Sequence, residues 1–314
     1  MTISARLFDA DGVDTEYDVL AEGLVDGDER RLVWIDVDSR SDSDLGPLGR
    51  RILLPSGLIE HLRGETLVPS VQQYPDRIHV SVVSLEPDAD PTVVDLVAGQ
   101  DWVLTVHEGP LPAVERILGG IEGETRLGAL DAGSFLAAIV QSVMVGYYAV
   151  IEGLEDDIDD LDEAALDRRP TEDVLAGIVA IRRRIGHVRR LLAPHREAFA
   201  VLERPDMALH DELGQSVPGL LARFEGTMDA VDRLREALLG TYDIYMGRAA
   251  QRDSQVMKAL TILSAILLPS VVLAGLMGMN FKLAFFDSAE NFWIVIGAMV
   301  TLAVAILLIA RAKA

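Results

Sequence analysis

Two long uncharged runs, residues 259–279 and 292–310, constrain the fold of this chain more than any other feature. Each run has about 20 residues, and an α-helix rises about 1.5 Å per residue, so each would form a helix about 30 Å long. That length matches the hydrocarbon core of a bilayer. The sequence therefore predicts a membrane protein with two transmembrane helices joined by a short external loop at residues 280–291.

The rest of the chain is strongly acidic. Its 28 Lys and Arg residues against 50 Asp and Glu residues give a formal net charge of −22. Such a surface repels nucleic-acid phosphates and attracts cations, so divalent cations are expected as partners and nucleic acid is not. The absence of cysteine excludes disulfides and thiolate metal sites. The first residues are acidic and contain no apolar core, so no cleavable secretory signal is expected.

Basic residues flank the two runs on what would be the same side of the membrane. Arg248, Arg252 and Lys258 precede the first run, and Arg311 and Lys313 follow the second. Because Lys and Arg are retained on the cytoplasmic side, both termini are predicted to be cytoplasmic. The protein is then a multi-pass protein of the inner (plasma) membrane, with residues 311–314 as a short cytoplasmic tail.

The polar part is expected to be an α/β domain followed by helices, which makes the chain an α+β membrane protein. In residues 1–132, β-branched runs at 31–37, 78–85, 92–97 and 102–107 alternate with turn residues and predict strands, and 48–64 predicts short helices. From residue 133 the apolar period becomes helical. Residues 133–204 are predicted to form an antiparallel helical hairpin with one acidic arm and one arginine-rich arm.

A very long helix is expected to follow this hairpin. Residues 205–215 have the composition of a loop, and Ser216 and Pro218 suit the first turn of a helix. Between Gly219 and Met277 only Pro269 interrupts the sequence. Residues 216–279 are therefore predicted to form one stalk helix that continues into the first transmembrane span.

One face of this helix carries mostly small or hydroxyl-bearing side chains through the membrane. Steps of three and four residues place Ser254, Met257, Thr261, Ser264, Leu268, Val271 and Gly275 on it. Such a face suits either close helix packing or a pore lined by one helix from each of several identical subunits. Two helices cannot enclose a conduit alone, so the pore interpretation requires an oligomer.

The same line continues toward the cytoplasm with acidic residues. Seven-residue steps carry Asp229, Glu236 and Asp243. Repeated around an axis, these side chains would form acidic rings in a vestibule that attracts cations. The alternative is that they are solvated positions of a heptad.

The first span ends in Gly278-Met279-Asn280, which closes the first of two C-terminal spans after a long stalk. It is preceded by Val256-Met257-Lys258-Ala259-Leu260-Thr261 and by Leu268-Pro269. In these features, and over nearly its whole length, the chain resembles the CorA family of divalent metal transporters and its zinc-transporting relatives of the CorA/ZntB superfamily. The resemblance implies a homopentamer in the lipid bilayer, with the stalk helices lining one central pore.

The resemblance also implies roles for individual residues. Gly278, Met279 and Asn280 would form the selectivity filter, in which Asn280 meets the outer shell of a hydrated ion. The family's apolar gate corresponds to Met257, Leu260 and Leu268, which would close the pore by dewetting. Uptake would be passive, because a divalent cation entering a negative interior gains about 4.6 kcal/mol per 100 mV.

The chain departs from the family pattern at several positions. Ser254 stands where an Asn is usual at the cytoplasmic neck, Val271 replaces a hydroxyl-bearing pore residue, and Met277 replaces the Tyr before the motif. The external loop also lacks the Met-Pro-Glu-Leu segment of many members. Asp287 and Glu290 are expected to supply the external negative potential instead.

The ion and the activity have alternatives. Mg²⁺ is favoured, and Zn²⁺ with or without proton coupling, Co²⁺ and Ni²⁺ are the alternatives within the superfamily. The six histidines show no ligand spacing and are interpreted as surface or capping residues. A membrane scaffold that has lost conduction is the alternative from another class. No enzyme and no cofactor are expected, because the chain lacks a P-loop, His-Glu-x-x-His, Gly-x-Ser-x-Gly and a Cys nucleophile.

Overall fold

The structure is a computed structural model that describes residues 3–10, 14–22, 24, 31–119, 131–166, 172–204, 206–207, 209–278 and 289–312. The chain divides into two units. The first unit comprises Met1–Ala164 with Glu172–Tyr242, and the second comprises Ala165–Thr171 with Asp243–Ala314. The first unit holds a β-sheet and its covering helices, and the second holds the two apolar helical segments nearest the C-terminus.

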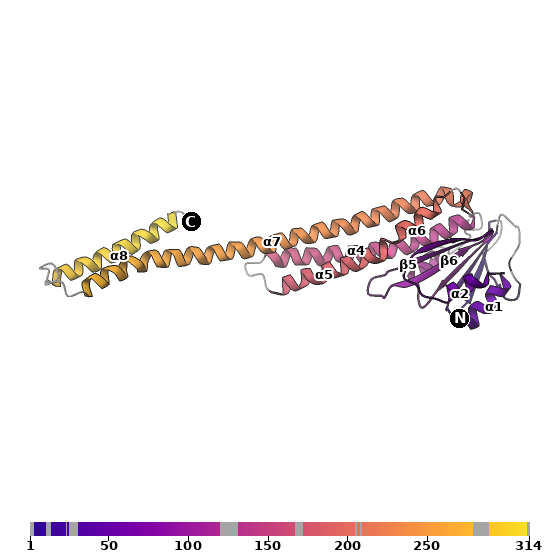
Figure 1. Ribbon diagram of the computed structural model, residues 1–314, viewed down its shortest axis with the longest axis horizontal. Coiled ribbons are helices and arrows are strands. Elements are labelled where there is room, and N and C mark those ends of the chain that lie inside the picture. The colour runs from indigo at the N-terminus through magenta and orange to yellow at the C-terminus, as the bar shows by residue number, and fades with distance from the viewer. Residues whose placement is uncertain are drawn as a thin grey trace. The chain divides into compact units, whose positions relative to one another are not determined.

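The first unit is built on a seven-stranded sheet in the order β2-β1-β3-β7-β6-β5-β4 (Figure 1). Among the strand pairs, β3 and β7 run parallel and the others run antiparallel. The strands predicted from β-branched runs are confirmed, whereas β1 and the edge strands β2 and β4 were not predicted, because these three strands are short or only half apolar. The strands are β1 (Ile3–Asp9), β2 (Thr15–Glu16), β3 (Arg31–Asp38), β4 (Ser70–Gln73), β5 (Ile78–Ser84), β6 (Thr92–Ala98) and β7 (Trp102–His107).

One face of the sheet is covered by the short helices α1 (Asp42–Arg51) and α2 (Ser56–Leu62). Their buried leucines join a core with Val33, Ile35 and Val97 of the strands. The two helices approach closely, since a Cβ at Gly49 would lie 2.5 Å from the Ile59 side chain. The helices predicted within 48–64 are confirmed, but α1 begins earlier, at Asp42.

The opposite face is covered by α4 (Ala132–Leu166) (Figure 1). Because side chains alternate along a strand, Trp34 points away from Val33 and Ile35, and its ring meets Phe135 of α4 edge-on at 5.3 Å. Further along α4, a Cβ at Gly146 would lie 2.3 Å from the carbonyl oxygen of Leu85. Glycine is therefore required there for the helix to reach the end of β5. The helix α3 (Pro112–Gly119) precedes α4 in the chain.

The outer edge of β5 is completed by side chains instead of a strand. The pairing of β4 with β5 ends at Ser81, so beyond it no strand among the described residues pairs with β5 on that side. There the hydroxyl of Tyr147 donates to the carbonyl oxygen of Val83 at 3.0 Å, and Nε2 of His195 accepts from the Val83 N–H at 3.1 Å. These contacts satisfy buried backbone groups that an open sheet edge would leave unpaired.

His195, the first residue of α6 (His195–Leu202), makes the stability of this edge depend on pH. Burial lowers the pKa of His195 from 6.5 to about 4, so the unfolded chain takes up a proton in this range and the folded chain does not. The stability that neutral His195 contributes is fully present above pH 6.5 and is lost as the pH falls toward 4. The total loss is about 3 kcal/mol. We expect hydrogen exchange at the Val83 amide to become faster over this pH range, because the free energy of opening this edge falls.

The matched control for this prediction is His195→Gln, whose amide oxygen can still accept the Val83 N–H but does not titrate. Other ionisable groups add the same background to both proteins. The difference between wild type and variant should therefore vary with pH by the amount given above. Identical pH profiles would show that His195 is not the titrating group.

The helical hairpin is confirmed. α5 (Glu172–Leu192) returns antiparallel along α4: near the start of α5 the Gly177 backbone faces the Leu161 side chain, and later in α5 Arg184 pairs with Asp157. The predicted apolar stripe of α5 is buried, and the arginines on its other faces are exposed. Most of the acidic block of α4 is exposed as well.

The long helix α7 runs from His210 to Gly278, and α8 runs from Ala289 to Ala312. The loop expected over 205–215 is wrong from His210 onward. The helix already begins at His210, so a composition typical of loops did not prevent helix formation there. Within the first unit, α7 buries Leu220, Phe224, Val231, Leu234 and Leu238.

Candidate ion-conduction site

Three helices in the described part of the chain are long and apolar enough to cross a membrane. The apolar window of α4 is 56% buried inside the protein, so its apolar residues belong to the core that covers the sheet. The apolar windows of α7 and α8 are 0% buried. These two helices correspond to the two predicted spans, and their exposed apolar surface is typical of a membrane protein.

The membrane part of α7 has one partly covered face. Half-buried positions recur at Ile262, Ile266, Pro269, Ser270 and Leu273, at helical steps of three and four. On α8 the half-buried positions follow a similar period, as expected where two helices of one chain pack together. The remaining faces of both helices are exposed in the single chain.

The predicted pore face lies on the other side of α7. At about 100° per residue, it is centred opposite the half-buried stripe. Met257 is 60% exposed, Leu260 54%, and Leu268 and Val271 67% each. Ser254, Thr261, Ser264 and Gly275 are exposed as well. The structure thus brings all eight predicted pore residues to one side of one helix.

The hydroxyl groups on α7 are oriented by the helix itself. Oγ1 of Thr261 donates to the carbonyl oxygen of Met257 at 2.8 Å, and Oγ of Ser270 donates to that of Ile266 at 2.9 Å. A hydroxyl that has used its hydrogen in this way presents only oxygen lone pairs outward. On the exposed face, the Thr261 hydroxyl therefore offers an acceptor suited to a cation or to a water of its shell.

Pro269 adds a second source of oxygen. It has no N–H, so the carbonyl of Ala265 one turn earlier loses its helical donor. A free backbone carbonyl at membrane depth needs another partner, such as water in a cavity.

The outer and inner ends of the predicted pathway are described in part. Gly278 is the last residue of α7, and Glu290 is exposed in the first turn of α8. Met279, Asn280 and Asp287 lie outside the described residues. Nearer the N-terminal end of α7, Asp229, Glu236 and Asp243 are all exposed, in the register that the heptad predicted.

The histidines depart from their expected positions. His79 and His107 are buried in strands, so the interpretation of all six as surface or capping residues is wrong for these two; His195 is buried as well, but its Nδ1 contacts the Leu192 carbonyl at the end of α5. In the described part of the chain, one group of three possible metal ligands is formed by His61, His79 and Asp95. The sequence did not reveal this group, because its members come from three elements that strand register and the packing of α2 bring together.

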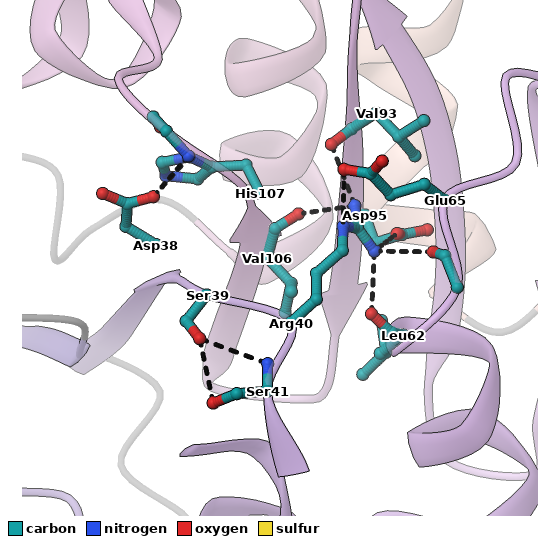
Figure 2. Close-up of polar contacts among 12 residues, drawn as sticks. Asp38, Ser39, Arg40, Ser41, Leu62, Glu65, Val93, Asp95, Val106 and His107 are labelled. Atoms are coloured by element: carbon teal, nitrogen blue, oxygen red, sulfur yellow. Dashed lines mark hydrogen bonds and ion pairs between the residues drawn. The ribbon is translucent and has the colours of Figure 1, made fainter. Parts of the chain in front are cut away.

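His107 is held at the end of β7 by two acids of β3. Burial disfavours its charged form, but Asp36, the Gly109 carbonyl and Asp38 outweigh burial and raise the pKa of His107. Nε2 of His107 lies 3.3 Å from Asp36, and Nδ1 lies 2.7 Å from the Gly109 oxygen. Figure 2 shows His107 beside Asp38.

Comparison with known proteins identifies relatives along most of the chain. The family model described as CorA-like Mg²⁺ transporter protein matches residues 29–311. The cobalt/magnesium transport protein CorA of Methanocaldococcus jannaschii is 23% identical over 283 residues, 88% of each chain. The protein of the same name from Thermotoga maritima is 28% identical over 150 residues, 47% of this chain and 42% of its own. The zinc transport protein ZntB of Pectobacterium carotovorum is 26% identical over 258 residues, 79% of this chain and 76% of its own.

Solved structures show the same fold. The complete structure of the CorA magnesium transporter from Methanocaldococcus jannaschii matches with a TM-score of 0.75 at 21% identity, covering 100% of this chain and 98% of that chain. The full-length CmaX protein matches with a TM-score of 0.71 at 20% identity, covering 98% and 97%. At these identities the likeness shows the fold and not the substrate.

The sequence match, the shared fold and the two exposed apolar helices agree with one another. The family is one of metal-ion transporters and not of enzymes. The chain therefore belongs to the CorA-like Mg²⁺ transporter family, within the CorA/ZntB superfamily.

Proposed function

We propose that this chain is a passive channel for divalent cations, above all Mg²⁺, that assembles as a homopentamer in the plasma membrane with both termini cytoplasmic. One observation carries this proposal. The membrane part of α7 has one half-buried face, and the opposite face bears exposed hydroxyl, small and apolar side chains at Ser254, Thr261, Ser264, Leu268 and Gly275. A single chain leaves this face open, whereas several copies around an axis would turn it toward a shared pore.

The side chains on this face fit two tasks in a pore. Met257, Leu260 and Leu268 would form apolar rings, which stop ions when the constriction dewets. The hydroxyl oxygens of Ser254, Thr261 and Ser264 would contact the water shell of the ion. The large apolar residues on the other exposed faces, such as Leu263 and Leu267, would face lipid.

The choice of Mg²⁺ rests on the chemistry of the predicted filter and pore. Mg²⁺ keeps its waters and prefers oxygen partners. Asn280 offers an amide oxygen, and the predicted pore face carries no histidine. The curated relatives include both cobalt/magnesium and zinc transport proteins, so Zn²⁺ transport, with or without protons, is the second candidate.

The acidic residues extend this proposal beyond the membrane. Exposed Asp229, Glu236 and Asp243, repeated in five subunits, would raise the local cation concentration at the cytoplasmic end of the pore. Glu290 and Asp287 would do the same at the outer end. No cofactor is needed, because the membrane potential drives uptake.

Replacing Asn280 with alanine is expected to reduce Mg²⁺ flux by at least about tenfold, since losing about 1.4 kcal/mol of stabilisation at the filter is enough for that. The measurement is Mg²⁺ entry into liposomes that contain a Mg²⁺ dye under an inside-negative potential. Asn291→Ala is the matched control, because Asn291 is the other asparagine of the chain and lies on α8. Its flux should equal that of wild type.

The same liposomes distinguish the alternatives when they hold a Zn²⁺ dye or a pH dye. Mg²⁺ entry that follows the potential and ignores a pH gradient supports the proposal. Zn²⁺ entry accompanied by proton movement would instead identify Zn²⁺ as the transported ion. Native mass spectrometry should give five times the 34.1 kDa chain. If such pentamers conduct none of the ions tested, the alternative of a non-conducting membrane scaffold would be favoured.

A further inference from the structure

Three metal-ligand side chains meet between α2 and the sheet of the first unit. His61 lies on α2, His79 on β5 and Asp95 on β6, and one ligand atom from each lies within 4.8 Å of the others. Strand register explains two of them: His79 pairs with Val97 and Ser81 pairs with Asp95, so His79 and Asp95 are diagonal neighbours on one face. The ring of His61 then meets that of His79 edge-on, with centroids 4.9 Å apart.

His79 is prepared as a ligand by its neighbour. Its Nε2 lies 2.8 Å from Oδ1 of Asp95, and a carboxylate at that distance holds the proton on Nε2. The other nitrogen, Nδ1, then carries a free lone pair. This atom is buried and has no hydrogen-bond partner in the described part of the protein, although burying an unsatisfied acceptor is costly. A carboxylate behind a histidine is the arrangement that orients metal-bound imidazoles.

Asp95 is itself fixed in place by Arg40. One guanidinium nitrogen of Arg40 lies 2.7 Å from Oδ2 of Asp95, and the same guanidinium donates to the carbonyls of Leu62, Gly64 and Val93 (Figure 2). A carboxylate anchored by one oxygen keeps the other in a constant position.

The charges around the cluster also favour a cation. Glu65 lies 3.9 Å from Nε of Arg40, so Asp95 and Glu65 together more than balance the charge of Arg40. His61 is half-buried and the Glu65 side chain is 54% exposed, which leaves a route for an ion from solvent.

We propose that His61 and His79 bind a divalent cation of the Zn²⁺ or Co²⁺ type in the cytoplasmic domain, with Asp95 as the carboxylate that orients His79. Imidazole ligands suit Zn²⁺, Co²⁺ and Ni²⁺, whereas Mg²⁺ prefers oxygen ligands. The two ligands come from α2 and β5, so the bound ion ties α2 to the sheet. The site is built entirely from the first unit and does not depend on which ion the pore conducts.

The test is a Co²⁺ titration of the full-length protein in detergent, after removal of metal with a chelator. An Asn280→Ala background removes the pore motif as a second site. We expect visible ligand-field absorption that saturates at one Co²⁺ per chain, is displaced by Zn²⁺ and is unaffected by excess Mg²⁺. Zn²⁺ should also raise the thermal unfolding temperature.

Variants decide whether these residues form the site. His61→Ala removes a half-buried ligand and leaves the buried pair of His79 and Asp95 intact, so it should fold and bind Co²⁺ at least about tenfold more weakly. Asp95→Asn should weaken binding by about 10–100-fold, as loss of an orienting carboxylate does. His187→Ala, at an exposed position on α5, is the matched control and should bind as wild type does. Unchanged Co²⁺ binding in His61→Ala, or displacement by Mg²⁺, would overturn the proposal.

Discussion

Replacing Arg40 with methionine is expected to lower the unfolding free energy of the first unit by about 3–5 kcal/mol. The side chains of Arg40 and Asp95 are 4% and 1% exposed, so the substitution leaves a buried carboxylate without its cationic partner. Burial alone would raise the pKa of Asp95, but His79 and Arg40 outweigh it and keep that pKa below its usual value. Methionine also has no N–H to donate, so the carbonyl oxygens of Leu62 and Val93 lose the hydrogen bonds that Arg40 gives them.

Urea unfolding followed by tryptophan fluorescence measures this loss. A Trp293→Phe background removes the tryptophan of α8 and leaves Trp34 and Trp102, which both lie in the sheet. Arg182→Met is the matched control, because Arg182 is exposed on α5, and it should change stability by no more than about 0.5 kcal/mol.

A double variant separates the two causes of the lost stability, which are the unpaired carboxylate of Asp95 and the lost hydrogen bonds to carbonyl oxygens. Arg40→Met combined with Asp95→Leu removes both charges, and it should recover much of the stability, because no unpaired buried charge remains. If Arg40→Met alone behaves like Arg182→Met, the ion pair does not stabilise the sheet and the argument fails.

Attaching a cationic thiol reagent at Ser264→Cys is expected to abolish cation flux. The chain contains no cysteine, so the introduced thiol is the single target. If α7 lines a pore, five bound cations would face the permeating ion in a medium of low dielectric constant. A barrier increase of only about 3 kcal/mol already slows flux by roughly a hundredfold.

Ser270→Cys is the matched control for this experiment. Ser270 is half-buried on the face of α7 opposite Ser264, and its hydroxyl bonds to the carbonyl of Ile266. The reagent should leave its flux unchanged. Equal block at both positions, or at neither, would contradict the assignment of the pore face. A neutral reagent of similar size tests whether charge or bulk causes the block at Ser264→Cys.

Local sequence patterns predicted the central strands and the helices well. β5, β6 and β7 are β-branched runs bounded by turns, and α5 repeats apolar residues with a helical period. The edge strands β2 and β4 were not predicted, because their residues become strands only through pairing with a neighbour. The start of α7 was also placed too late, because residues 205–215 were assigned to a loop by composition alone, whereas the helix begins at His210.

The pore face could be predicted because it depends on one helix alone. Its residues share a face by helical geometry, and the structure leaves that face exposed opposite the half-buried one. The group of His61, His79 and Asp95 could not be predicted in the same way. Its members are brought together by the register of β5 on β6 and by the packing of α2, and neither leaves a periodic signal in the sequence.

The sequence by itself determined that two apolar helices end this chain, that one face of α7 differs from the others, and that the remaining surface is acidic. These properties follow from hydropathy, helical period and charge, which are local. The tertiary structure alone decided that α4, apolar enough to span a membrane, instead covers a sheet, and that Arg40, Asp95 and His79 meet in a buried cluster. Burial and long-range pairing depend on contacts between distant segments, and such contacts exist only once the chain has folded.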